Sequence, residues 1–176
     1  RQKLKQQILS KAFSLHSEGK LIEASKNYQK FLDEGFSDPR VFLNYGAISK
    51  QIGQFDKAIS LYKKANSLFP NNAISYSNLG SLFLDLGQLQ QAEFYTRKAI
   101  EINPDSAASN CNLGNILKDF SKLDQAEFYL KRSIEIDINL SAAYFSLLSL
   151  YESTNQLLKL EEFINDNINK DLIKNE

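Results

Sequence analysis

Apolar residues recur along the chain at intervals of three and four, the spacing that places side chains on one face of an α-helix. In the stretch 73–86 the residues on this face are Tyr76, Leu79, Gly80 and Phe83. In the stretch 89–102 they are Leu89, Ala92, Tyr95, Ala99 and Ile102. The pattern predicts helices at residues 3–17, 21–34, 39–52, 55–68, 73–86, 89–102, 107–120, 123–136, 141–154 and 157–168. The expected fold class is therefore all-α, without a sheet.

Turn and capping residues mark where these helices start and end. Gly87 lies between two of them and suits a left-handed turn. Pro70 and Pro104 are placed to end the helices that precede them. Asp38 before Pro39 is typical of a helix start, because the carboxylate caps free backbone N–H groups and proline fits the first turn.

A period of 34 residues runs through the whole pattern. The segment YSNLGSLFLDLGQLQQAEFY at 76–95 returns as NCNLGNILKDFSKLDQAEFY at 110–129. Three columns of residues 34 apart are Ala24, Ala58, Ala92, Ala126 and Leu160; Ala12, Gly46, Gly80, Gly114 and Leu148; and Gly19, Gly53, Gly87, Ser121 and Asn155. Such a period predicts a solenoid, in which stacked hairpins bury apolar faces that a single hairpin cannot. We expect one domain over 1–176, with units at about 5–38, 39–72, 73–106, 107–140 and 141–176.

Small residues in these columns predict close helix crossings. Glycine or alanine at a crossing lets two helices approach more closely than leucine does. We expect Gly80 to meet Ala92, and Gly46 to meet Ala58.

The arrangement of aromatic and small residues resembles the tetratricopeptide repeat. The third unit carries Tyr76, Leu79, Gly80, Phe83, Ala92 and Pro104 in the order of that family's signature. The second unit carries Phe42, Tyr45, Gly46, Ala58, Tyr62 and Pro70. The resemblance covers nearly the whole chain and implies a right-handed α-α superhelix of five hairpins, open as an arc.

Departures from the signature gather toward the C-terminal end. The fourth unit has Asn110 where an aromatic residue is expected and Ile138 where proline is expected. The fifth has Leu148 and Leu160 in the two small-residue columns. We interpret the fifth unit as a degenerate terminal hairpin, either a cap or the transition to a further domain.

Composition narrows the classes of function. Lys plus Arg and Asp plus Glu both number 21, so the net charge is zero, which disfavours a nucleic-acid or membrane-surface partner. Cys111 is the single cysteine, and a cytoplasmic location fits. The chain contains no methionine and begins at Arg1, so we expect it to be part of a longer protein.

Catalytic chemistry is not indicated. No glycine loop of the phosphate-binding types is present. His16 is the single histidine and lies far along the chain from Cys111, which disfavours a nucleophile pair or a metal site. We therefore expect no enzyme activity, no metal and no cofactor.

An asparagine column does not fit core packing. Asn44, Asn78 and Asn112 are 34 residues apart, each directly before an apolar residue followed by glycine. Asparagine is a mediocre helix former, and its amide both donates and accepts hydrogen bonds. In the tetratricopeptide geometry this helix face lines the concave groove. The column therefore predicts contacts to the backbone of an extended peptide.

The same column resembles the asparagine ladder in the repeat arm of O-linked N-acetylglucosamine transferases and in importin-type solenoids. The stretch NLGNILKD is close to the transferase pattern, where similarly placed aspartates contact peptide side chains. The resemblance implies that Asp85, Asp119, Asn115 and Lys118 select among peptides. A second mode, the carboxylate clamp that binds chaperone C-termini, is disfavoured because its basic pair is absent.

Three functions stay open at this point. The leading hypothesis is a protein-interaction scaffold with a protein or peptide partner. The second is the substrate-recruiting arm of a larger transferase-type enzyme. The third is a structural or self-associating module, in which the amides stiffen the stack and the chain forms a weak homodimer.

Overall fold

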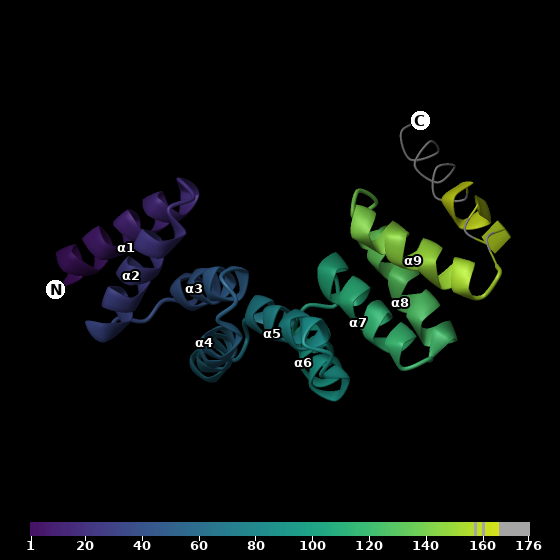
Figure 1. Cartoon of the computed structure of the whole chain (residues 1–176), viewed down its shortest axis with the longest axis horizontal. Coiled ribbons are helices and arrows are strands. Elements are labelled where there is room, and N and C mark those ends of the chain that lie inside the picture. The colour runs from purple at the N-terminus through teal and green to yellow at the C-terminus, as the bar shows by residue number, and fades with distance from the viewer. Residues whose placement is uncertain (157, 160, 166–176) are drawn as a thin grey trace. The chain divides into compact units, whose positions relative to one another are not determined.

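The computed structural model describes residues 1–156, 158–159 and 161–165. Their regular structure is helical, with no strand among the described residues (Figure 1). The helices are α1 (Gln2–Ser17), α2 (Leu21–Asp33), α3 (Pro39–Gln51), α4 (Phe55–Leu68), α5 (Ala73–Asp85), α6 (Leu89–Ile102), α7 (Ala107–Asp119), α8 (Leu123–Ile136) and α9 (Ser141–Ser153). These bounds confirm the first nine predicted helices to within one residue. Residues 158–159 and 161–165 of the tenth are also helical, whereas Leu160 lies outside the described residues.

Each helix packs mainly on its neighbours in sequence. Hairpins form from α1 with α2, α3 with α4, and α7 with α8. Successive hairpins meet through α2 with α3, α6 with α7, and α8 with α9, and α7 also contacts α9. The fold is thus the expected all-α helical repeat, since the core is built between consecutive elements. The chain divides into two compact units, Arg1–Leu82 (unit 1) and Phe83–Glu176 (unit 2), described separately here.

The turn inside each hairpin explains one 34-residue column. Gly87 has φ +69°, in the left-handed region that glycine enters without strain. Ser121 (φ 58°) and Asn155 (φ 55°) hold the same position in later units without glycine. The turn geometry therefore persists where the residue changes, and asparagine tolerates this region better than most residues.

The start of α3 is capped as expected. The backbone N–H of Arg40 donates to Asp38 Oδ1 at 2.9 Å, and Pro39 occupies the first turn. Asp38 itself is extended, with φ −156° and ψ 128°. The cap satisfies one of the free N–H groups at the helix start.

The small-residue crossings at Gly46 and Gly114 are close, and the nearest side chain at each belongs to the residue one turn beyond the small one. A Cβ atom at Gly46 would lie 2.5 Å from Cε1 of Tyr62, one turn beyond Ala58. At Gly114 it would lie 2.6 Å from Cγ of Leu130 and 3.2 Å from the backbone oxygen of Ala126. The nearest atoms to Gly46 thus belong to the large side chain one turn beyond Ala58, and the expected contact of Gly46 with Ala58 itself stays a prediction.

The fourth-unit departure at Asn110 is compensated locally. Asn110 is 2% exposed, and its Nδ2 donates to the backbone oxygens of Pro104 at 3.0 Å and Ser106 at 2.9 Å. A buried amide with both N–H groups bonded avoids the cost of burying an unpaired polar group. Asn110 thus fixes the turn before α7, where an aromatic residue would only fill space.

Candidate functional site

A cavity of about 580 Å³ opens on the first helices of the two hairpins in unit 1. Its lining residues are Phe13, His16 and Ser17 from α1 and Arg40, Leu43 and Asn44 from α3. We call the surface that the first helices of the hairpins form within each unit its first-helix face. Asn44, a predicted peptide-binding residue, therefore borders a hollow on that face.

A buried tyrosine ties the cavity wall to the second helix of the first hairpin. Tyr28 of α2 is fully buried, and Asn44 Nδ2 donates to its hydroxyl oxygen at 3.4 Å. The same oxygen lies 3.1 Å from His16 Nδ1, so the Tyr28 hydroxyl can donate to that nitrogen in the tautomer that leaves it unprotonated. Burial raises the pKa of Tyr28, while the hydrogen bond from Asn44 acts in the opposite direction. The hydroxyl thus stays neutral at physiological pH and links α1, α2 and α3.

The positive charge at the cavity edge is already paired. Arg40 Nη2 and Nε donate to the two carboxylate oxygens of Asp38 at 2.8 and 3.0 Å. These hydrogen bonds hold the pKa of Asp38 below its usual value. The Arg40 guanidinium also lies 5.2 Å from the centroid of the Phe13 ring. A compensated guanidinium stacked on an aromatic ring is a poor clamp for a free carboxylate.

The other two asparagines of the column differ from Asn44. Asn78 on α5 of unit 1 and Asn112 on α7 of unit 2 are both half-buried. Within the described part of the chain, neither amide makes a hydrogen bond, and neither is sealed from solvent. Their donors and acceptors are therefore available to a ligand.

In unit 2 the predicted selectivity residues lie along α7. Asn115 Nδ2 is 3.8 Å from Cys111 Sγ, and Lys118 Nζ donates to Ser149 Oγ of α9 at 3.2 Å. Burial raises the pKa of the Cys111 thiol, which favours its neutral form. Asp119 is exposed at the end of α7, and Asp85 is exposed at the end of α5. Lys118 thus reaches the next first helix, whereas Asn115 stays within its own.

The sequence reasoning predicted only Asn44 among the six cavity residues, although the period contained the signal for the three on α1. Phe13, His16 and Ser17 stand 102 residues before Asn115, Lys118 and Asp119, that is, three repeats earlier in the same columns. Each of the later residues was predicted to line the groove. Extending their columns to the first unit would have found the three residues of α1.

Models of one protein family match the centre of the chain. They are described as tetratricopeptide repeat at residues 73–106, TPR repeat at 46–87, and tetratricopeptide repeat at 95–128. These matches fall on the hairpins and small-residue crossings described above. The chain is a tetratricopeptide-repeat protein.

Solved structures agree with this assignment. MamA superposes with TM-score 0.80 at 22% identity, covering 99% of this chain and 95% of that chain. TTC0263, a thermophilic TPR protein of Thermus thermophilus, gives 0.73 at 20% identity, with 92% and 89% covered. YrrB, described as a TPR protein with an unusual peptide-binding site, gives 0.71 at 22% identity, with 92% and 84% covered. At these identities the likeness concerns the fold. No curated protein matches the chain.

The fold of this tetratricopeptide-repeat protein indicates its coarse function. Among the described residues, no group of three or more His, Cys, Asp or Glu side chains is arranged to hold a metal ion. In the same part of the chain, no helix combines the length and apolar character needed to cross a membrane. Repeat solenoids present extended surfaces to other proteins, so the coarse function is that of a protein-interaction scaffold.

Proposed function

We propose that the first-helix face binds an extended peptide segment of a partner protein, with asparagine amides contacting the peptide backbone. The observation that carries the proposal is the state of Asn78 and Asn112. Both recur at the repeat period, both are half-buried, and both lack a hydrogen bond within the described residues. An amide in this state offers a donor and an acceptor to a peptide group.

Asn44 has a divided role in this proposal. One of its N–H groups is directed at Tyr28 over a long 3.4 Å contact. Its oxygen and second N–H are left for a ligand in the adjoining cavity. We therefore expect Asn44 to contribute both to packing between α3 and α2 and to peptide binding.

Selectivity would come from the flanking columns. Asp85 and Asp119 are exposed charges at helix ends, suited to basic or hydrogen-bonding peptide side chains. Asn115 and Lys118 would contribute polar contacts beside Asn112. YrrB, which shares the fold, has a peptide-binding site by its description, and this makes peptides the first partner class to test.

The test is a peptide-library selection on the whole chain, followed by calorimetry on variants. The triple change Asn44→Ala, Asn78→Ala and Asn112→Ala is expected to weaken binding at least about tenfold, because each removes a partner of a peptide group. The loss should be similar for peptides of different sequence, since main chain is being contacted. Substituting Asp85 and Asp119 should change which peptides bind.

Asn27→Ala is the matched control. Asn27 is an asparagine of a second helix, and its Nδ2 donates to the backbone oxygen of Glu23 at 2.8 Å. Its removal should leave peptide affinity and helicity unchanged. If the triple variant binds like the wild type, the asparagine column serves stack stiffness and the proposal fails.

A further inference from the structure

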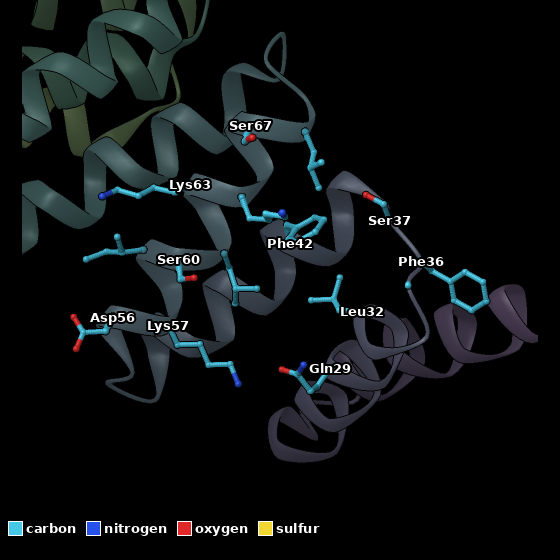
Figure 2. Close-up of a pocket in the computed structure, with 15 residues that line it drawn as sticks. Gln29, Leu32, Phe36, Ser37, Phe42, Asp56, Lys57, Ser60, Lys63 and Ser67 are labelled. Atoms are coloured by element: carbon cyan, nitrogen blue, oxygen red, sulfur yellow. The ribbon is translucent and has the colours of Figure 1, made fainter.

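Unit 1 carries a second, larger hollow between α2 and α4, the second helices of its two hairpins. This cavity of about 950 Å³ shares no residue with the one on the first-helix face. Gln29 and Leu32 from α2 and Lys57 from α4 point into the space between the two helices (Figure 2). Phe36, on the connection after α2, borders its end.

The hollow continues along the helices. An adjoining cavity of about 550 Å³ shares Gln29 and Lys57 with the first and extends to Ile22 and Ile52. Together they form a groove alongside α2, whose 13 residues correspond to about 20 Å. We call this the α2–α4 groove. Its length matches about three to four turns of a further helix.

Apolar side chains stand at both ends of the α2–α4 groove. Ile22 is 64% and Ile52 43% exposed at one end, and Leu68 is 43% exposed at the other. Leu32 and Leu61 form a more buried floor between them. Exposed apolar residues spaced along a groove are the anchors that an amphipathic helix uses.

The edges of the α2–α4 groove are basic although the chain as a whole is neutral. The two aspartates among the lining residues are Asp33 and Asp56. Asp33 already accepts a hydrogen bond from Gln29 Nε2 at 2.8 Å. The lysines are Lys26, Lys30, Lys57, Lys63 and Lys64. A positive rim around an apolar floor complements an acidic amphipathic segment.

Unit 2 carries a charge pair at the positions that correspond to two lining residues of the α2–α4 groove. Between α6 and α8, Arg132 Nη2 bridges to Asp105 Oδ1 at 2.9 Å, joining the second helix of one hairpin to the end of the preceding one. The residues two repeats earlier are Lys64 and Ser37, which both line the α2–α4 groove and have no such charge pair. Replacing aspartate by serine removes the bridge and leaves a lysine at the rim.

We infer that the α2–α4 groove binds an acidic amphipathic helix of a partner protein. The inference is independent of the proposed peptide site, because the two surfaces have no lining residue in common. The lysines set the charge of the ligand, and the isoleucine and leucine anchors set its apolar stripe.

The probe is a fluorescent designed peptide of about 14 residues, with leucines three and four apart and glutamates elsewhere. Two comparison peptides are its scrambled version, which lacks the stripe, and its lysine-for-glutamate version. The acidic amphipathic peptide is expected to bind the whole chain with an affinity about tenfold or more higher than that of either comparison peptide. Its affinity should fall when salt is added. Equal binding of all three would overturn the inference.

Variants then locate the binding. The double change Lys57→Glu and Lys64→Glu reverses two charges at the rim of the groove. It should lower the affinity for the probe peptide by about tenfold or more. The double change Ser37→Asp and Lys64→Arg introduces the aspartate–arginine pair of unit 2 at the equivalent positions. It should also lower the affinity for the probe peptide. Helicity should stay at the wild-type level in both, since the lysines are at the surface.

The triple asparagine variant is the control for the other face. It should bind the acidic probe like the wild type, while the lysine variants keep any affinity for peptides of the first-helix face. If the asparagine variant no longer binds the probe peptide, or if both groove variants bind it like the wild type, the probe binds elsewhere. Either result would contradict the inference that it binds in the α2–α4 groove. Failure of the asparagine site alone leaves this result unaffected.

Discussion

Asn66 is a buried polar residue whose amide has no hydrogen-bond partner. It is 9% exposed on α4, and within the described residues neither its Nδ2 nor its Oδ1 is bonded. In the other repeats its position is occupied by apolar residues. These are Leu32, 34 positions earlier, and Ile100 and Ile134, 34 and 68 positions later. Leaving a buried polar group unpaired costs about 1–3 kcal/mol. Asn66 is thus a weak point in a column that is otherwise apolar.

Asn66→Leu is expected to stabilise the protein by about 1–3 kcal/mol, because leucine has a similar shape and no polar atom to leave unpaired. Thermal unfolding followed by circular dichroism measures the change. The control is Asn110→Leu, where both N–H groups are bonded to Pro104 and Ser106, and a stability loss is expected. A lower Tm for Asn66→Leu would mean that its amide is satisfied in solution.

At the scale of the element, one carboxylate joins three helical segments. Glu127 of α8 accepts from Lys131 Nζ at 2.7 Å and from the Tyr151 hydroxyl of α9 at 2.8 Å. Lys159 Nζ lies 3.9 Å from the other carboxylate oxygen, and the Lys131 ammonium lies 5.2 Å from the Phe163 ring centroid. The degenerate fifth hairpin is therefore held to α8 by charge and aromatic contacts as well as by packing.

Glu127→Gln is expected to lower stability by about 1 kcal/mol at neutral pH, with the difference lost in acid. Burial acts to raise the pKa of Glu127, but the hydrogen bonds from Lys131 and Tyr151 outweigh it, and the pKa lies below its usual value. A lowered folded-state pKa stabilises above the unfolded pKa of about 4.3, and that stability disappears as the pH falls through the folded value. Urea unfolding of the wild type and of Glu127→Gln from pH 7 to about pH 3 measures how the difference in their free energies of unfolding decreases.

Glu93→Gln is the matched control for this prediction. Glu93 stands one repeat earlier and pairs with Arg97 at 2.8 Å, four residues on, as Glu127 pairs with Lys131. Its carboxylate carries no bond comparable to that from Tyr151 among the described contacts. A smaller effect than that of Glu127→Gln is expected, and an equal effect would show that the link to α9 adds nothing.

At the scale of the whole molecule, helices are stabilised by their neighbours in sequence. Unit 1 has its core among residues such as Tyr28, Phe31 and Val41, and unit 2 among residues such as Leu113 and Leu130. In a repeat chain, stability is approximately a sum of unit and nearest-neighbour terms. A change in one hairpin should therefore be felt locally.

Gly46→Ala is expected to speed amide hydrogen exchange in α3 and α4 while leaving α7 and α8 unchanged. The added Cβ would lie 2.5 Å from the buried Tyr62 ring, and overpacking of this kind costs about 1–3 kcal/mol. Exchange measured residue by residue reports such local opening. Gly114→Ala, whose Cβ would meet Leu130, should give the reverse pattern. Uniform acceleration in both variants would indicate a single cooperative unit.

Local and periodic features of this protein followed from the sequence alone. Helix bounds were predicted to within a residue because apolar spacing, Asp38 with Pro39, and the glycine at the hairpin turn all act over a few neighbouring residues. The family was predictable for the same reason, because the same local sequence signature recurs in several repeats. The asparagine column was also visible, although its role in binding stays a prediction.

Tertiary structure decided which side chains fill the space that this pattern leaves. It placed the Tyr62 ring against Gly46 and directed Asn44 toward Tyr28. It also opened the α2–α4 groove, whose walls come from residues on separate helices. Side-chain reach across helices depends on rotamer and packing in three dimensions, and repeat spacing along the chain does not specify these.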